Sequence, residues 1–89
     1  MANPLGMDVT EIRRIGNQLI TEAANMGAVI SRATAQVNTA KAAWKGTDAD
    51  HFVNDWTQKR SQLSAIQDRI RSLGNEALYQ ANQQAAISR

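Results

Sequence analysis

A long run of apolar residues, spaced alternately three and four apart, constrains the fold of this chain more than any other feature. This spacing lines one face of a helix that packs beside another helix at a shallow angle. Asp8, with Glu11 three residues later, is typical of a helix start. We therefore predict a first helix over about residues 8–43. The run comprises Val9, Ile12, Gly16, Leu19, Ala23, Met26, Ile30, Ala33, Val37, Ala40 and Trp44.

The run stops at Trp44-Lys45-Gly46, at the middle of the chain. Glycine readily takes the left-handed backbone conformation that ends a helix, so Gly46 marks a break. The segment 47–50 comes next, with a hydroxyl and two carboxylates, which favour the start of a new helix. We predict a turn at about 44–47, with Trp44 at its tip and able to pack on the first residues of the second helix.

The same spacing resumes after the turn and predicts a second helix over about residues 48–86. Two glycines interrupt these patterns in different ways. Gly16 lies on the first stripe, where a missing side chain allows close helix approach, whereas Gly74 suggests fraying or a kink. The second stripe comprises Ala49, Phe52, Trp56, Lys59, Leu63, Ile66, Ile70, Leu73, Ala77, Gln80, Gln84 and Ile87.

The predicted fold is all-α: one domain over residues 1–89, an antiparallel helix-turn-helix hairpin after a loose lead-in at 1–7. Aromatic residues make up only 4% of the chain, so a lone hairpin of 89 residues would bury little apolar surface. Ile15, Ile20 and Val29 also make the first stripe too wide for a single partner helix. We therefore predict pairing with a second hairpin into a four-helix bundle. The predicted partner interface comprises Ile12, Leu19, Met26, Ile30, Val37, Phe52, Trp56, Leu63, Ile66 and Ile70.

Little in the sequence favours catalysis or ligand chemistry. There is no cysteine, and the one histidine, His51, lies beside Asp48 and Asp50 without further ligands or a nucleophile motif. The net charge of +2 and the acids between the basic residues of the second helix argue against nucleic-acid binding. We expect no enzyme activity, no metal and no cofactor. No apolar run is long enough for stable membrane insertion, and the N-terminus has no pattern of a cleavable signal peptide.

The combination of two such helices, a Trp-x-Gly junction at Trp44 and Gly46, and a length near one hundred resembles the WXG-motif family of small type VII secretion proteins. The resemblance covers nearly the whole chain. Phe52, Trp56 and Leu63 also match apolar positions that are usual in that family.

The resemblance implies head-to-tail four-helix bundles, either homodimers or heterodimers with a paralogous WXG-family protein. It also implies export of the folded protein from the cytoplasm by a type VII secretion ATPase. Many members carry an export signal with a tyrosine four residues before an acid; here Tyr79 is followed by Gln83, so the acid is missing. A partner could then carry the full signal. Two alternatives stay open: an intracellular structural or adaptor hairpin that binds a partner protein, and a targeting module for a separately encoded toxin.

Overall fold

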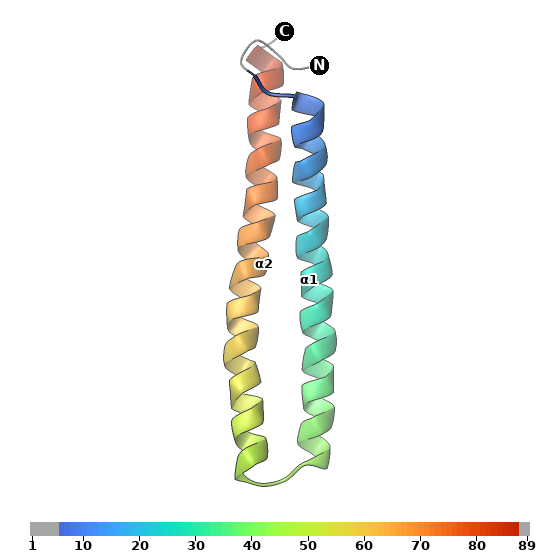
Figure 1. The fold of residues 1–89 in the computed structure, drawn as a ribbon, viewed down its shortest axis with the longest axis vertical. Helices are drawn as coiled ribbons and strands as arrows, with labels where there is room; N and C mark the ends of the chain where they lie inside the picture. The colour runs from blue at the N-terminus through green and yellow to red at the C-terminus, as the bar shows by residue number, and fades with distance from the viewer. Residues whose placement is uncertain (1–5, 88–89) are drawn as a thin grey trace.

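The computed structural model describes residues 6–87 and contains two long helices, α1 (Val9–Ala43) and α2 (Thr47–Ile87). They run side by side in opposite directions, so the start of α1 and the end of α2 lie at the same end of the molecule (Figure 1). The predicted helical hairpin is confirmed. Most of the predicted lead-in, residues 1–5, lies outside the described residues.

The start of α1 follows the predicted signal in part. Asp8 is the N-cap, and its side chain accepts a hydrogen bond of 3.0 Å from the backbone N–H of Glu11. The Glu11 carboxylate bonds instead to the guanidinium of Arg14, one turn further on. The Asp8 cap therefore satisfies one backbone N–H at this end, and it is worth about 1 kcal/mol.

The turn is built differently from the prediction. Helix α1 ends with Trp44 in an extended conformation, and the positive φ of Gly46, +113°, belongs to the start of α2. The carbonyl of Gly46 accepts the first helical hydrogen bond of α2, from the N–H of Asp50 at 3.2 Å. Gly46 is thus the N-terminal cap residue of α2, and Thr47 is its first helical residue. The acids at 48 and 50 lie in the first turn, where they suit the helix dipole.

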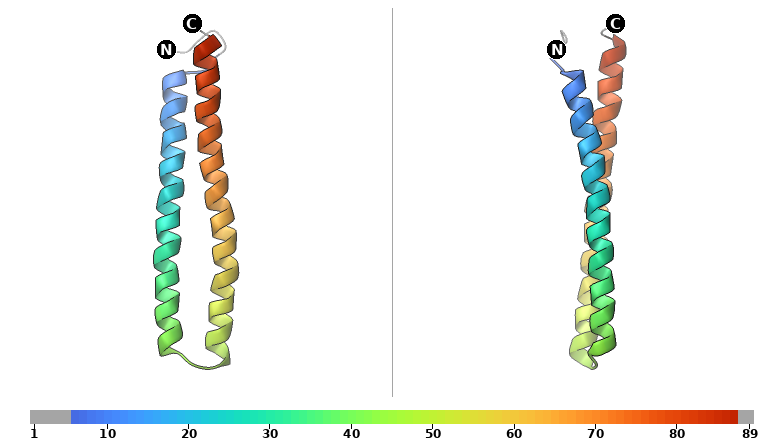
Figure 2. Two further views of the ribbon diagram at one scale, coloured as in Figure 1. Left: turned by 180° about the vertical axis from the view of Figure 1, so that it is seen from behind. Right: turned by 90° about the vertical axis from the view of Figure 1, so that its right-hand side faces the viewer.

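The hairpin is thin and elongated. It measures 65 × 16 × 14 Å, and its radius of gyration is 19.7 Å, against about 12 Å for a compact domain of this length. The helices cross at a shallow angle when viewed from the side (Figure 2). Within the described residues, the buried hydrophobic side chains are three alanines and one isoleucine: Ala23, Ile30, Ala49 and Ala81.

Two buried glycines bring the helices together. A Cβ on Gly74 would lie 2.7 Å from the carbonyl oxygen of Gly16, and one on Gly16 would lie 2.9 Å from that of Gly74. The close approach predicted at Gly16 is confirmed. The kink or fray suggested at Gly74 is wrong: α2 continues through this residue, and Gly74 is the other half of the contact.

Candidate interaction surface

The residues of α2 that face α1 agree only in part with the predicted stripe, because every second position is shifted by one residue. Residues 49, 56, 63, 70, 77 and 84 face α1 in both the predicted and the observed phase. Between them, the structure turns Val53, Gln67, Gly74 and Ala81 inward, whereas the pattern of large apolar residues predicts Phe52, Ile66 and Leu73. At Gly74 the helices approach too closely for a bulky side chain, so glycine takes the inner place there and Leu73 lies outside the contact.

The displaced bulky residues form an exposed line along α2. Phe52, Ile66 and Leu73 are 42–50% exposed, and they repeat at multiples of seven residues, so they lie on one side of the helix. Helix α1 carries a matching line with Ile15 and Val29, which are 38% and 54% exposed. We call these five residues the apolar face.

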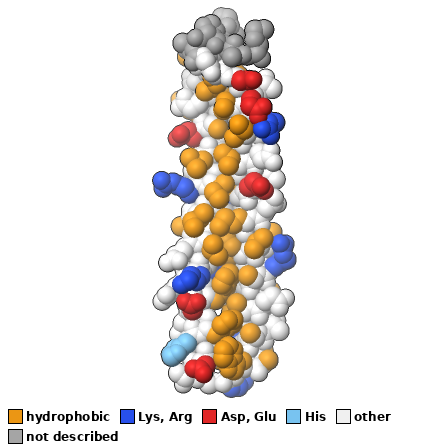
Figure 3. All heavy atoms as spheres, in the orientation of Figure 1, with side chains coloured by type: hydrophobic (Ala, Val, Ile, Leu, Met, Phe, Trp, Pro, Cys, Tyr) orange, Lys and Arg blue, Asp and Glu red, His pale blue; other side chains and the backbone are white. Residues whose placement is uncertain are grey.

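Both lines flank the same edge of the contact between the helices. Each lies next to the inward column of its own helix, and two antiparallel helices place such flanking columns on one side of the pair. Hydrophobic side chains form a band along the hairpin, with charged residues at its borders (Figure 3). The half-buried Leu19, Met26 and Leu63 belong to the adjoining inward columns.

The residues of the predicted partner interface therefore fall into three groups. Ile30 is buried between α1 and α2. Phe52 and Ile66 are exposed on the apolar face. The others are half-buried in the contact between the helices: Ile12, Leu19, Met26, Val37, Trp56, Leu63 and Ile70. Sequence reasoning noted Ile15, Val29 and Leu73 as stripe residues but did not include them in the interface; their seven-residue repeat is the signal that identifies them.

The tip of the hairpin is aromatic. The rings of Trp44 and Phe52 lie 5.5 Å apart at an interplanar angle of 47°, which is a favourable tilted arrangement. The predicted packing of Trp44 on the residues after the turn is confirmed. Both side chains remain more than two-fifths exposed, so this pair also extends the apolar face to the tip.

The C-terminal part of α2 is attached to α1 by a polar contact. The guanidinium of Arg13 donates two hydrogen bonds, of 3.1 and 2.9 Å, to the side-chain oxygen of Asn82. Tyr79 is 59% exposed, and Gln83, one turn later, is also exposed. The two residues of the candidate export signal thus lie on the outer surface of an ordered helix, and neither makes the contact with α1.

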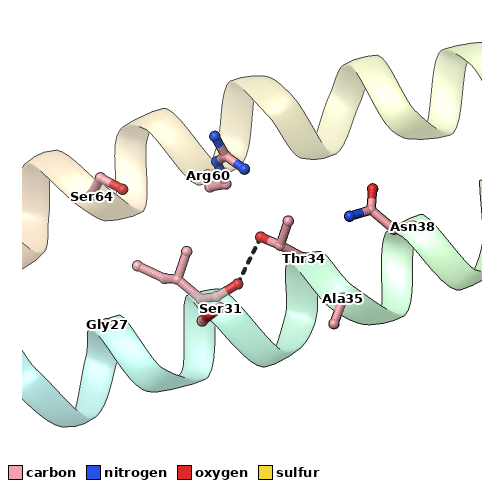
Figure 4. Close-up of a pocket in the computed structure, with 8 residues that line it drawn as sticks. Gly27, Ser31, Thr34, Ala35, Asn38, Arg60 and Ser64 are labelled. Atoms are coloured by element: carbon pink, nitrogen blue, oxygen red, sulfur yellow. Dashed lines mark hydrogen bonds between the residues drawn. The ribbon is translucent and has the colours of Figure 1, made fainter.

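The opposite edge of the hairpin is polar. An open groove of about 460 Å³ is lined there by Gly27, Ile30, Ser31, Thr34, Ala35, Asn38, Arg60 and Ser64. Arg60 and Ser64 of α2 lie across from the hydroxyl and amide side chains of α1 (Figure 4). Beside this groove the indole N–H of Trp56 donates to the Thr34 hydroxyl at 3.1 Å, and that hydroxyl donates to the Ile30 carbonyl at 2.8 Å. The hydroxyl therefore links the two helices.

The ionisable groups form short-range surface pairs. Lys59 pairs with Asp55 at 3.3 Å and Arg71 with Asp68 at 3.0 Å, each within one helix. The hydrogen bond and the charge of Glu11 raise the pKa of the Arg14 guanidinium above its ordinary value, so that group stays charged. Residues 6–87 contain no cluster of three or more metal-ligating side chains, and neither helix within them is apolar enough to cross a membrane.

Comparisons with protein-family models, curated proteins and solved structures find no match.

Proposed function

We propose that this chain is a non-enzymatic helical hairpin that pairs with a second hairpin in a four-helix bundle. We further propose that the bundle is exported by bacterial type VII secretion, as in the WXG-motif family that the sequence resembles. The observation that carries the proposal is the apolar face, a line of large side chains left uncovered along a hairpin whose own contact buries mainly alanine and glycine.

The energetics of burial favour a long helical partner. Burying one large apolar side chain fully is worth about 1.5–3 kcal/mol. Five half-exposed side chains therefore offer several kcal/mol, comparable with the whole stability of a small domain. A face 65 Å long and 16 Å wide presents on the order of 1,000 Å², and a typical partner contributes about 800 Å² to a stable interface. An antiparallel hairpin of similar length fits this face.

The C-terminal part of α2 is the basis for the proposed export. Tyr79 is exposed and held on a regular helix, so a secretion ATPase could bind it without unfolding the hairpin. Gln83 lies one turn later on the same surface. We propose that export depends on Tyr79. Because Gln83 is uncharged, we propose that a partner carries the acid that this chain lacks, and that an acid introduced at position 83 would strengthen export.

The test is to express the epitope-tagged chain in a bacterium with an active type VII system and in the same strain lacking the secretion ATPase. We expect the chain in the medium only when the ATPase is present. Tyr79→Ala should reduce the exported fraction at least fivefold, Gln83→Glu should raise it, and the exposed control Asn75→Ala should leave it unchanged. Equal amounts in the medium of both strains would overturn the export proposal.

A second candidate function is an intracellular adaptor hairpin that binds a partner protein through the same face. The observation that favours it is Gln83, which leaves the tyrosine motif without its charge. The chain would be expressed with and without co-expressed neighbouring proteins. If it stayed in the cell in both cases while another substrate of the same system was exported, this function would be supported.

A further inference from the structure

We propose that the polar groove binds an extended peptide segment of a partner protein, through one side-chain carboxylate of that segment. The groove holds about 460 Å³ and is lined by residues of both helices. It lies on the other edge of the hairpin from the apolar face, so this inference goes beyond the proposed pairing and export and needs neither of them.

Arg60 is the charged residue of the groove lining, and no acid of the hairpin neutralises it. The residues one turn away from it along α2, at positions 56, 57, 63 and 64, are all uncharged. Lys59 and Arg71, by contrast, each have an aspartate one turn away and pair with it. The Arg60 side chain makes no ion pair or hydrogen bond within residues 6–87. A guanidinium with free N–H donors suits a carboxylate, which accepts two parallel hydrogen bonds from it.

Three neutral polar side chains of the lining are also free to bind a ligand. Ser31, Asn38 and Ser64 make no side-chain hydrogen bond within residues 6–87, and the Asn38 amide points from α1 toward α2 (Figure 4). The Thr34 hydroxyl, in contrast, already accepts from Trp56 and donates to a backbone carbonyl. Free hydroxyl and amide groups both donate and accept, so they match the N–H and C=O groups of a peptide backbone.

The shape and chemistry of the groove favour an extended chain over other occupants. Its lining on α1 runs from Gly27 to Asn38, roughly 16 Å along the helix, which is the length of about five extended residues. A docked helix needs pockets for large apolar anchors, but Ile30, the large apolar residue of the lining, is buried between the helices. Single-stranded nucleic acid needs a row of cations and aromatic rings for stacking, whereas this lining has one cation and no aromatic residue.

The experiment is NMR of the ¹⁵N-labelled native chain with three mixtures of capped five-residue peptides. Each mixture has varied neutral residues at its outer positions and a central glutamate, glutamine or lysine. We expect the glutamate peptides to shift the signals of the groove residues with a Kd of about 1 mM or below, as suits one exposed charge pair with a few hydrogen bonds. The glutamine peptides should bind at least about fivefold more weakly, and the lysine peptides more weakly still.

Two matched pairs of variants locate the site. Arg60→Gln should weaken binding of the glutamate peptides at least about fivefold. Arg69→Gln should not, although it removes the same charge from another exposed arginine of α2 that has no ion pair within residues 6–87. Ser64→Leu should block the groove without a change of charge, whereas Ser72→Leu, at an exposed position outside the lining, should leave binding intact. Circular dichroism of each variant checks that the hairpin stays folded.

The absence of groove shifts at about 5 mM glutamate peptide, several times the expected Kd, would overturn the site. Equal binding of the glutamate and glutamine peptides would overturn the carboxylate as the group that Arg60 recognises. Equal weakening by both arginine variants, or tighter binding of a short single-stranded DNA, would assign binding to overall charge and overturn the peptide as the ligand. None of these results depends on pairing or export, so failure of this inference is distinguishable from failure of the proposed function.

Discussion

Glycine residues determine where the two helices touch, and their effects differ from site to site. Gly74→Ala would place a Cβ 2.7 Å from a backbone carbonyl of α1, and backbone cannot move as a side-chain end does. Overpacking costs ~1–3 kcal/mol and better helix propensity returns ~1. We therefore expect a net loss of up to about 2 kcal/mol, measured by urea unfolding at fixed protein concentration.

Gly27→Ala is the matched control for this prediction. Its Cβ would lie 2.5 Å from the side-chain nitrogen of Gln67, the end of a flexible side chain that can turn away. We expect this variant to be unchanged or to gain up to about 1 kcal/mol from helix propensity. If both glycine variants lost the same stability, the close backbone contact would not be what requires Gly74.

Gly46 is required for a different reason, because its φ of +113° is a conformation that side chains disfavour. The position has open space around it, so an added Cβ meets backbone strain and no clash. Gly46→Ala should cost about 1–2 kcal/mol in urea unfolding. Lys45→Ala, one residue earlier in the same turn, should change stability by less than about 0.5 kcal/mol.

At the scale of the helices, the contact between Arg13 and Asn82 stabilises the end of α2. Arg13→Ala removes both hydrogen bonds, so we expect amide hydrogen exchange at residues 80–86 to become about threefold faster, a loss near 0.6 kcal/mol. Arg14→Ala is the control, because Arg14 bonds to Glu11 and Gln18, which both lie on α1. Similar exchange in the two variants would show that the contact does not hold the helix end.

The sequence predicts both helices well, because the spacing, the cap at Asp8 and the break at Gly46 act locally. It predicts the phase of α2 only in part. Two columns compete for the inner place, one with Phe52, Ile66 and Leu73 and one with Val53, Gly74 and Ala81. Hydrophobicity favours the first, but close approach of the helices at Gly16 and Gly74 requires the second. That choice depends on a contact between residues 58 positions apart, which a pattern along one helix does not contain.

At the scale of the whole molecule, the proposed pairing and the small core of a single hairpin lead us to predict that folding depends on association. A dimer that folds as it forms is stabilised by mass action, so its melting temperature rises with protein concentration. We expect a rise of several degrees between 5 and 500 µM monomer, about 2.7 kcal/mol of added stabilisation for a hundredfold change, measured by the loss of helicity on heating. A melting temperature independent of concentration would show that the lone hairpin accounts for its own stability.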